Sequence, residues 1–303
     1  MENTHITYSL AILFLPLLAF LIQIFVGKRL PRQGDWVSIS AIVTTLVLAS
    51  LLFVDMFQQY NPNFKIEASF LWMDLGDFKI YLGFLVDNIT IIMLLVVALI
   101  STCTHIFSLK YLEGDVRYSR YYAYLGLFTF SMNGIVLANN LVSMYIFWEL
   151  VGVSSYLLIG HWFEKESAAN AAKKAFLTNR VGDIGFFIGI MIIFTAVGSF
   201  AFTDIFASVA SGTIGGTTLT FAGICLFAGA MGKSSQFPLH IWLPDAMEGP
   251  TPVSALMHAA TMVAAGVYLT VRIFPLLTSD ALLFVAYIGG FTALFAAAIA
   301  LTH

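Results

Sequence analysis

The stretch NITIIMLLVVALISTCTHIFSL, residues 88–109, contains no Asp, Glu, Lys or Arg and as a helix is long enough to cross a bilayer. Ile6 to Val26 and Trp36 to Val54 are also free of these residues. The whole chain of 303 residues is 59% hydrophobic and 10% charged, with a mean hydropathy of +0.90. So little polar surface cannot cover a water-soluble domain of this size. The composition excludes a soluble enzyme and predicts an all-α polytopic membrane protein.

Extending this reading along the chain predicts about nine membrane-spanning helices. The uncharged run Tyr121 to Trp148 is too long for one helix, and Asn139-Asn140 marks a turn within it. The first span lacks a basic region before it and a cleavage site after it, so we expect it to be retained. The expected spans are 6–26, 36–58, 84–109, 120–138, 141–163, 174–198, 217–246, 252–274 and 281–302.

The loops predict both a hairpin and an orientation. Residues 64–86 alternate in part around a break at Met73–Asp77, which predicts a small external β-hairpin at about 60–83. The loops after spans 1, 3 and 5 hold nine basic residues, whereas the opposite loops hold Lys65 and Lys79. The positive-inside rule therefore predicts an external N-terminus and a cytoplasmic end of the ninth helix. The nine are Lys28, Arg29, Arg32, Lys110, Arg117, Arg120, Lys165, Lys173 and Lys174.

Charge and cysteine content exclude further classes. A net charge of −3 provides no basic field for nucleic acid. The two cysteines, Cys103 and Cys225, lie far apart in apolar segments, which gives neither a disulfide framework nor the spacing of a zinc or iron–sulfur site. We therefore expect no metal or redox cofactor bound through cysteine.

Four ionisable residues fall where hydrocarbon is expected: Glu149, Asp183, Lys233 and His258. A charge inside the membrane costs about 3 kcal/mol or more on insertion scales, so each requires a partner or a water-filled cavity. Glu149 lies roughly 12 Å into its helix, near the middle of a bilayer whose hydrocarbon core is about 30 Å thick. A proton or ion pathway is therefore the leading hypothesis, and a neutral, packed glutamic acid is the alternative.

A helix break accompanies the lysine. Pro238 lacks an N–H and frees the carbonyl four residues earlier, at Ser234. Broken helices at membrane depth commonly build transport sites. Lys233 beside such a break therefore indicates a transfer site, with a purely structural ion pair as the alternative.

Two other positions carry weaker signals. His258 shares a helical face with Ser254 and Thr261, and imidazole is a natural proton relay, although a packed core histidine fits equally well. Arg180 and Asp183, three residues apart, can pair along one helix, so a local salt bridge and a tuning role both remain open.

On these grounds two classes of function remain: an ion-translocating machine, and a membrane scaffold whose buried charges only fix helix packing. An intramembrane enzyme is a weaker third class, because the chain has no Ser/His/Asp set or H-E-x-x-H motif.

Several of these residues belong to longer motifs that resemble a known family, the antiporter-like subunits of respiratory complex I. The resemblance is greatest to subunit L, or chain 5, and extends to the A subunit of multisubunit sodium/proton antiporters. It covers the chain from its first helix to His303. The motifs are FWEL (147–150), TNRVGDIG (178–185), GKSSQFPL (232–239), WLPDAM (242–247), GPTPVSAL (249–256) and HAATMV (258–263).

The resemblance implies five-helix repeats, each with a broken helix, a central lysine on it and a glutamate on a neighbouring helix. It implies a proton relay of Glu149, Lys233 and His258, with Asp183 and Arg180 tuning the Glu/Lys pair and Pro238 at the break. Residues 1–119 would hold helices 1–3, residues 120–275 the first repeat, and 276–303 the start of a second. Because subunit L has about fourteen core helices, we expect a fragment or partial gene product.

The implied function is a proton-translocating subunit of NADH:quinone oxidoreductase in the bacterial inner membrane. NADH, FMN, iron–sulfur clusters and quinone would be bound by partner subunits, and a neighbouring antiporter-like subunit would be a direct partner. The alternatives are an A-type subunit of a multisubunit sodium/proton antiporter and a structural scaffold subunit.

Overall fold

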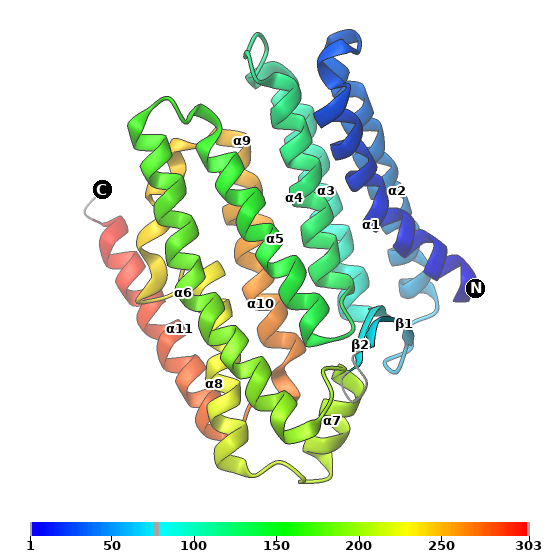
Figure 1. Ribbon diagram of the computed structural model, residues 1–303, viewed down its shortest axis with the longest axis vertical. Helices are drawn as coiled ribbons and strands as arrows, with labels where there is room; N and C mark the ends of the chain where they lie inside the picture. The colour runs from blue at the N-terminus through cyan, green and yellow to red at the C-terminus, as the bar shows by residue number, and fades with distance from the viewer. Residues whose placement is uncertain (1, 75–78, 302–303) are drawn as a thin grey trace.

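The uncharged runs of the sequence form the long helices of the computed structural model, which describes residues 2–74 and 79–301 (Figure 1). Within these described residues, seven helical segments are long and apolar enough to cross a membrane. The α-helices are α1 (Glu2–Phe25), α2 (Asp35–Gln58), α3 (Asn88–Tyr111), α4 (Tyr118–Leu137), α5 (Leu141–Ile159), α6 (Glu166–Val197), α7 (Phe202–Ala210), α8 (Gly216–Lys233), α9 (Thr251–Ser254), α10 (Met262–Arg272) and α11 (Ser279–Ala300).

Two of the nine expected spans, α4 and α8, are not among those seven, although both run alongside the other helices in Figure 1. Helix α4 buries 16 of its 20 residues inside the bundle, so its surface does not have to be apolar. Helix α8 ends at Lys233 and not at the predicted residue 246. The seventh span is therefore an 18-residue helix followed by irregular chain.

Helix α6 begins earlier than predicted. It contains 32 residues, about 48 Å of helix, and so extends beyond a hydrocarbon core of about 30 Å. Lys173 and Lys174, predicted to lie in a loop, are part of this helix. The connections α1–α2, α3–α4 and α5–α6 still lie at one end of the bundle, opposite the N-terminus and the hairpin (Figure 1).

Helices α6 and α8 approach each other closely through glycines. A Cβ atom added to Gly185 would lie 2.6 Å from the Cβ of Ala228, and one added to Gly189 would lie 2.7 Å from the backbone nitrogen of Leu226. The Gly-x-x-x-Gly spacing on α6 thus allows the two helices to pack closely. This contact brings the middle of α6 against the end of α8.

The predicted hairpin is confirmed, with later boundaries. Strands β1 (Lys65–Asp74) and β2 (Lys79–Asp87) pair antiparallel, with Lys65 opposite Asp87. The expected break at 73–77 falls largely outside the described residues. Helix α3 starts at Asn88 and not at 84, because the Asp87 carboxylate accepts the Thr90 N–H at 2.9 Å and caps the helix.

The expected turn between the fourth and fifth spans is also confirmed. The Asn140 side chain accepts the Ser143 N–H at 2.7 Å and caps α5. Because α5 starts at Leu141 and ends at Ile159, Glu149 lies in the middle of the helix.

Candidate functional site at a break in helix α8

The polypeptide leaves helical geometry directly after Lys233. Ser235 adopts a left-handed conformation with φ of 51°, and the Gln236 N–H donates to the Met231 carbonyl at 2.9 Å. This bond and the one from Ser235 to Gly232 form a Schellman-type helix end. The break therefore begins before Pro238, although the prediction of a broken helix is correct.

Two side chains beside the break donate hydrogen bonds to backbone carbonyls inside the bundle. The indole N–H of Trp242 donates to the Gly232 carbonyl at 3.1 Å. The Ser234 hydroxyl donates to the Val263 carbonyl at 2.7 Å, which attaches α8 to α10. These bonds attach the start of the irregular chain to the inside of the bundle.

Lys233 is completely buried and weakly held. Its exposed fraction is 0%, and the nearest carboxylate oxygen is Asp183 Oδ2, 3.7 Å from Nζ. Within the described part of the chain, Nζ has no hydrogen-bond partner. It lies 6.0 Å from the centre of the Trp148 ring, and a Cβ at Gly152 would come within 2.9 Å of it. The glycine thus leaves space for the ammonium group.

Asp183 is fixed on its other side. Its Oδ1 accepts the Trp148 indole N–H at 2.8 Å, and the residue is 1% exposed. Trp148 therefore contacts both members of the Asp183–Lys233 pair. The sequence analysis did not select it, but a buried indole next to Glu149 requires an acceptor and could have drawn attention to a polar neighbour.

Glu149 has a different partner from the one expected. Its carboxylate is paired with the Arg180 guanidinium, and their side chains are 19% and 35% exposed. Arg180 also lies over the Phe176 ring, 4.7 Å from its centre. The Glu149–Arg180 pair therefore lies at the edge of the bundle, outside the buried Asp183–Lys233 pair.

The local Arg180–Asp183 salt bridge, one of the two interpretations left open by the sequence, is not present among the described side chains, where two pairs between helices form instead. The expected direct Glu149–Lys233 contact is also not present among the described side chains. Residues three apart on a helix point about 60° apart. Arg180 consequently faces α5 at the edge, whereas Asp183 faces α8 inside.

His258 lies beside Trp242. It belongs to a π-helical segment, Ala255–Ala260, and its ring centre is 5.8 Å from that of Trp242. Neither ring nitrogen has a hydrogen-bond partner in the described structure. The hydroxyl of Thr261, which the sequence analysis placed on the same face as His258, donates to the Leu256 carbonyl. Another histidine that the sequence analysis did not select, His240, lies on the irregular chain with a buried Nδ1 that also lacks a partner in residues 2–74 and 79–301.

Within the described residues, no group of three or more His, Cys, Asp or Glu side chains is placed to hold a metal ion. The polar groups that the structure brings together at mid-depth are thus two carboxylates and two cations. Their formal charges sum to zero.

Comparison with known proteins gives two matches to protein families. Residues 138–303 match the family described as NADH:quinone oxidoreductase/Mrp antiporter, TM. Residues 72–122 match NADH-ubiquinone oxidoreductase (complex I), chain 5 N-terminus. A curated relative from Piper cenocladum, the chloroplastic NAD(P)H-quinone oxidoreductase subunit 5, is 43% identical over 319 residues. That alignment covers 100% of this chain and 42% of the relative, so the chain spans less than half of the relative's length.

Solved structures show the same fold. A chain of the Mrp complex from Dietzia is 26% identical with a TM-score of 0.74, covering 88% of this chain and 28% of its own. A chain of an archaeal respiratory complex, the membrane-bound sulfane sulfur reductase, is 20% identical with a TM-score of 0.78, covering 90% of this chain and 54% of its own.

Proposed function

Because the chain belongs to the NADH:quinone oxidoreductase/Mrp antiporter family of membrane proteins, we propose that it acts within a proton-translocating subunit of an NADH:quinone oxidoreductase. The 43% identity to a subunit 5 supports the oxidoreductase assignment. The chain itself carries the proton, and NADH, FMN, iron–sulfur clusters and quinone belong to partner subunits.

One observation carries the proposal: a fully buried lysine at a helix break faces one carboxylate at 3.7 Å and makes no hydrogen bond in the described structure. In an effective dielectric of about 20, opposite charges about 4 Å apart interact by about 4 kcal/mol. That energy is sufficient to decide whether a buried ammonium keeps its proton. A change in the charge or position of Asp183 therefore loads or unloads Lys233.

The Glu149–Arg180 pair provides a means to produce that change. When Arg180 is paired with Glu149, Asp183 is paired with Lys233. When Glu149 is protonated or displaced, Arg180 can instead pair with Asp183, which lies one turn away on the same helix. Because the outer pair is partly exposed at the bundle edge, movement of a neighbouring subunit can reach it. Energy from quinone reduction elsewhere in the complex would arrive by this route.

The proton would leave Lys233 towards His258. Trp242 donates its indole N–H to the carbonyl of Gly232, the residue before Lys233, and its ring also contacts the His258 ring. The unpartnered ring nitrogens of His258 fit a group that receives a proton, directly or through water. On this proposal the chain from about 120 to 275, which contains α4 to α10 with the short helices α7 and α9, forms the first five-helix repeat. Residues 276–303 begin the second repeat.

The finer assignments form part of the same proposal. We assign the chain to the subunit L type, beside another antiporter-like subunit, in a bacterial inner membrane with its N-terminus outside. The basic residues on the α1–α2, α3–α4 and α5–α6 connections support this orientation. Reporters fused after Arg32 and after Lys165 should read as cytoplasmic; an external reading for either would reverse it.

The alternative function is the A-type subunit of a sodium/proton antiporter, favoured by the likeness to the Dietzia Mrp complex. To separate the two, sealed vesicles that contain the full-length protein in its complex are energised with NADH, with and without sodium. We expect proton uptake that does not depend on sodium, that is lost in Lys233→Ala, and that is unchanged in the control Lys174→Gln, which removes a partly exposed cation paired with Asp245. Proton movement only against a sodium gradient, with no response to NADH, would support the antiporter. Normal proton uptake in assembled Lys233→Ala would support the scaffold.

A further inference from the structure

A cavity of about 210 Å³ lies at the end of the bundle that carries the basic connections, between the start of α4, the end of α5 and the start of α6. We call it the α4–α6 cavity. Cationic side chains surround its rim, and aromatic and aliphatic side chains line the remainder. Its lining residues include Arg117, Arg120, Lys173, Tyr124, Tyr156 and Leu157.

Two of its three cations have no ion-pair partner. Arg117 is paired with Glu164, and its guanidinium also lies over the Phe163 ring. Arg120 and Lys173 are exposed, and no ion pair or hydrogen bond joins either side chain to another described residue. Two uncompensated positive charges therefore face one cavity from helices on opposite sides of it.

The other carboxylate near the cavity is directed away from these two cations. Asp115 accepts the backbone N–H of Arg117 at 2.7 Å and the indole N–H of Trp162 at 3.1 Å. The imidazole of His161, which lines the cavity and is 2% exposed, lies 3.4 Å from the same carboxylate. Neither His161 ring nitrogen has a hydrogen-bond partner in the described structure. The polar contacts of Asp115 thus go to Arg117, Trp162 and His161, and none goes to Arg120 or Lys173 among the described residues.

The lining changes from charged to apolar with depth. Arg120 lies in the first turn of α4, and Tyr124 lies one turn deeper. Tyr156 and Leu157 lie in the last turn of α5, where the helix approaches the membrane surface. Tyrosine at such a boundary is typical of the headgroup level of a bilayer. A free phosphate would use only the cations, whereas a phospholipid would use both parts of the surface.

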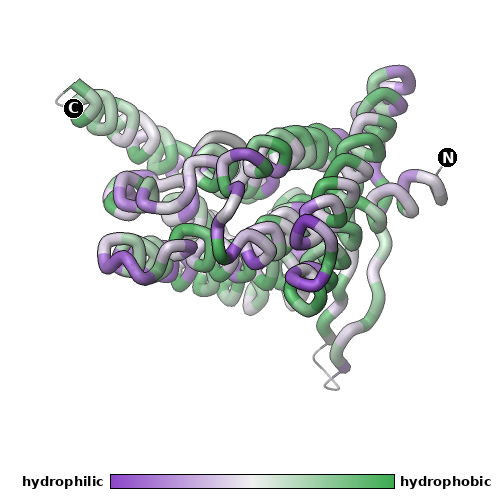
Figure 2. Tube along the Cα trace, turned by 90° about the horizontal axis from the view of Figure 1, so that it is seen from above, coloured by the Kyte–Doolittle hydropathy of each residue, from purple (hydrophilic) through white to green (hydrophobic). Residues whose placement is uncertain are grey.

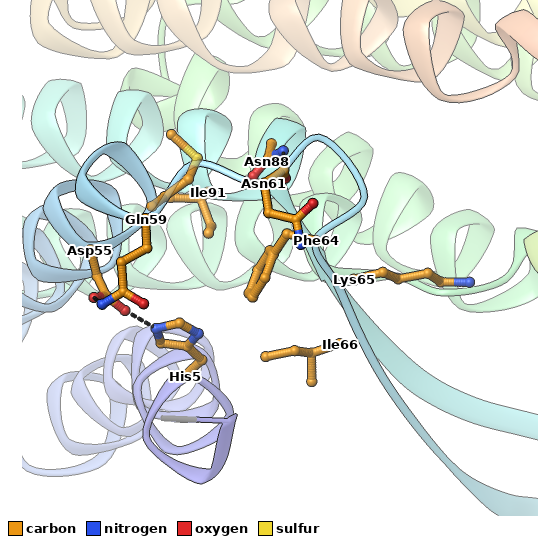
Figure 3. Close-up of a pocket in the computed structure, with 10 residues that line it drawn as sticks. His5, Asp55, Gln59, Asn61, Phe64, Lys65, Ile66, Asn88 and Ile91 are labelled. Carbon is orange, nitrogen blue, oxygen red and sulfur yellow. Dashed lines mark hydrogen bonds and ion pairs between the residues drawn. The ribbon is translucent and has the colours of Figure 1, made fainter.

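A cavity at the opposite end shows the contrast. It has a volume of about 300 Å³ and lies between α1, α2 and the hairpin (Figure 3). His5 and Asp55 pair across it, and Lys65 extends away to Glu67 and Thr203, each at 2.8 Å. Its cation is therefore neutralised by the protein, so this cavity has no comparable attraction for an anion.

We propose that the α4–α6 cavity binds the headgroup of an anionic phospholipid, with the phosphate held by Arg120 and Lys173 and an acyl chain lying over Tyr156 and Leu157. Basic pockets between membrane helices are suited to such headgroups, and each cation near the surface contributes comparably to the attraction. The site is distinct from the buried charges near Lys233 and does not depend on proton transfer.

The test uses the full-length protein in its complex, stripped of lipid and placed in phosphatidylcholine nanodiscs with spin-labelled phosphatidylglycerol. The double variant Arg120→Gln/Lys173→Gln should bind the labelled lipid roughly 30-fold more weakly. The matched control is Lys28→Gln/Arg29→Gln, which removes the same charges from exposed positions at the same end, outside the cavity. The control should bind nearly as well as wild type. Equal weakening in both variants would overturn the proposal, because it would show only general surface attraction.

A second variant separates a lipid from a free anion. Ala169→Phe fills the cavity from a partly exposed position and keeps both cations. We expect Ala169→Phe to weaken binding of labelled phosphatidylglycerol. In a separate competition experiment, we expect added inorganic phosphate to leave binding of the labelled lipid to the wild type unchanged. Displacement of the lipid by millimolar phosphate, or full binding in Ala169→Phe, would contradict a phospholipid site.

Discussion

Two buried cation–carboxylate pairs in this chain are built in opposite ways. At the hairpin end, Arg272 contacts both oxygens of Asp87 and donates to the hydroxyls of Thr90 at 3.0 Å and Tyr268 at 2.6 Å. At the middle of the bundle, Lys233 faces Asp183 at 3.7 Å without a hydrogen bond in the described structure. Both cations are almost fully buried, with exposed fractions of 6% and 0%.

The difference separates a structural pair from a transfer pair. A guanidinium held by four hydrogen bonds fixes the geometry of α3, α10 and the hairpin, and it cannot lose its proton in a protein. A lysine can be deprotonated, and one with a single loose partner loses little geometry when it is. The chain therefore uses arginine where it needs a permanent connection and lysine where the account requires the charge to change.

The largest effect should come from breaking the arginine pair. Arg272→Ala leaves the half-buried Asp87 without its cation, and breaking a buried pair in this way costs up to about 3–5 kcal/mol. We expect a large fall in assembled complex and in its thermal midpoint, measured on purified membranes. Proton flux per assembled complex should stay near that of wild type, and a selective loss of flux with normal assembly would show that the two pairs are not different in kind.

Glu149→Gln should produce the reverse pattern on a smaller energetic scale. The amide is nearly isosteric but cannot ionise, so Arg180 loses its anion at the edge of the bundle. We expect normal assembly and a fall in NADH-driven proton flux of about tenfold, equivalent to about 1.4 kcal/mol. The control Glu113→Gln neutralises an exposed carboxylate that pairs with Lys110 and should leave the flux unchanged. Normal flux in assembled Glu149→Gln would favour a packing role for Glu149.

The smallest effect concerns pH. Burial alone would raise the pKa of Asp87, but the Arg272 guanidinium and the Thr90 N–H outweigh it and hold the pKa of this carboxyl below its usual range. A lowered pKa contributes stability that is present above the unfolded value of about 3.9 and is lost as pH falls through the folded value. The contribution of Asp87 to thermal stability should therefore be constant between pH 5 and pH 8. A comparison of wild type with Asp87→Asn across that range measures it, and a difference that changes between pH 5 and pH 8 would contradict the assignment.

Much of the fold could be predicted because hydrocarbon places simple demands on a sequence. Uncharged runs predict the long helices, and Asn139-Asn140 predicts the turn before α5. The incorrect boundaries lie outside the hydrocarbon region, where the sequence does not have to be free of charge. The start of α6 was placed too late because a helix can continue past the membrane surface with lysines on it. The sequence predicts the end of the hairpin at about residue 83, but β2 continues to Asp87. The boundary is set by the Asp87 cap of α3, which depends on a single side chain.

The site residues could be selected from the sequence, but their partners could not. Charge at membrane depth identified Glu149, Asp183 and Lys233, since each is costly there. Periodicity gives the face of a helix on which a residue lies, but it does not give the neighbour that this face meets. Arg180 thus pairs with α5 and Asp183 with α8. The role of Trp148 depends on the same packing and was not visible in the sequence.

The most direct test of the account is proton flux in Lys233→Arg, in the full-length protein within its assembled complex. Arginine preserves the positive charge beside Asp183, so a structural pair should retain the wild-type flux with modest loss from the bulkier side chain. Arginine has a pKa above about 12 and cannot be deprotonated in proteins, so a carrier should fail. In sealed vesicles energised by NADH, with assembly measured separately, the account predicts normal assembly and poor proton flux. Wild-type proton stoichiometry in assembled Lys233→Arg would contradict it and leave the scaffold function.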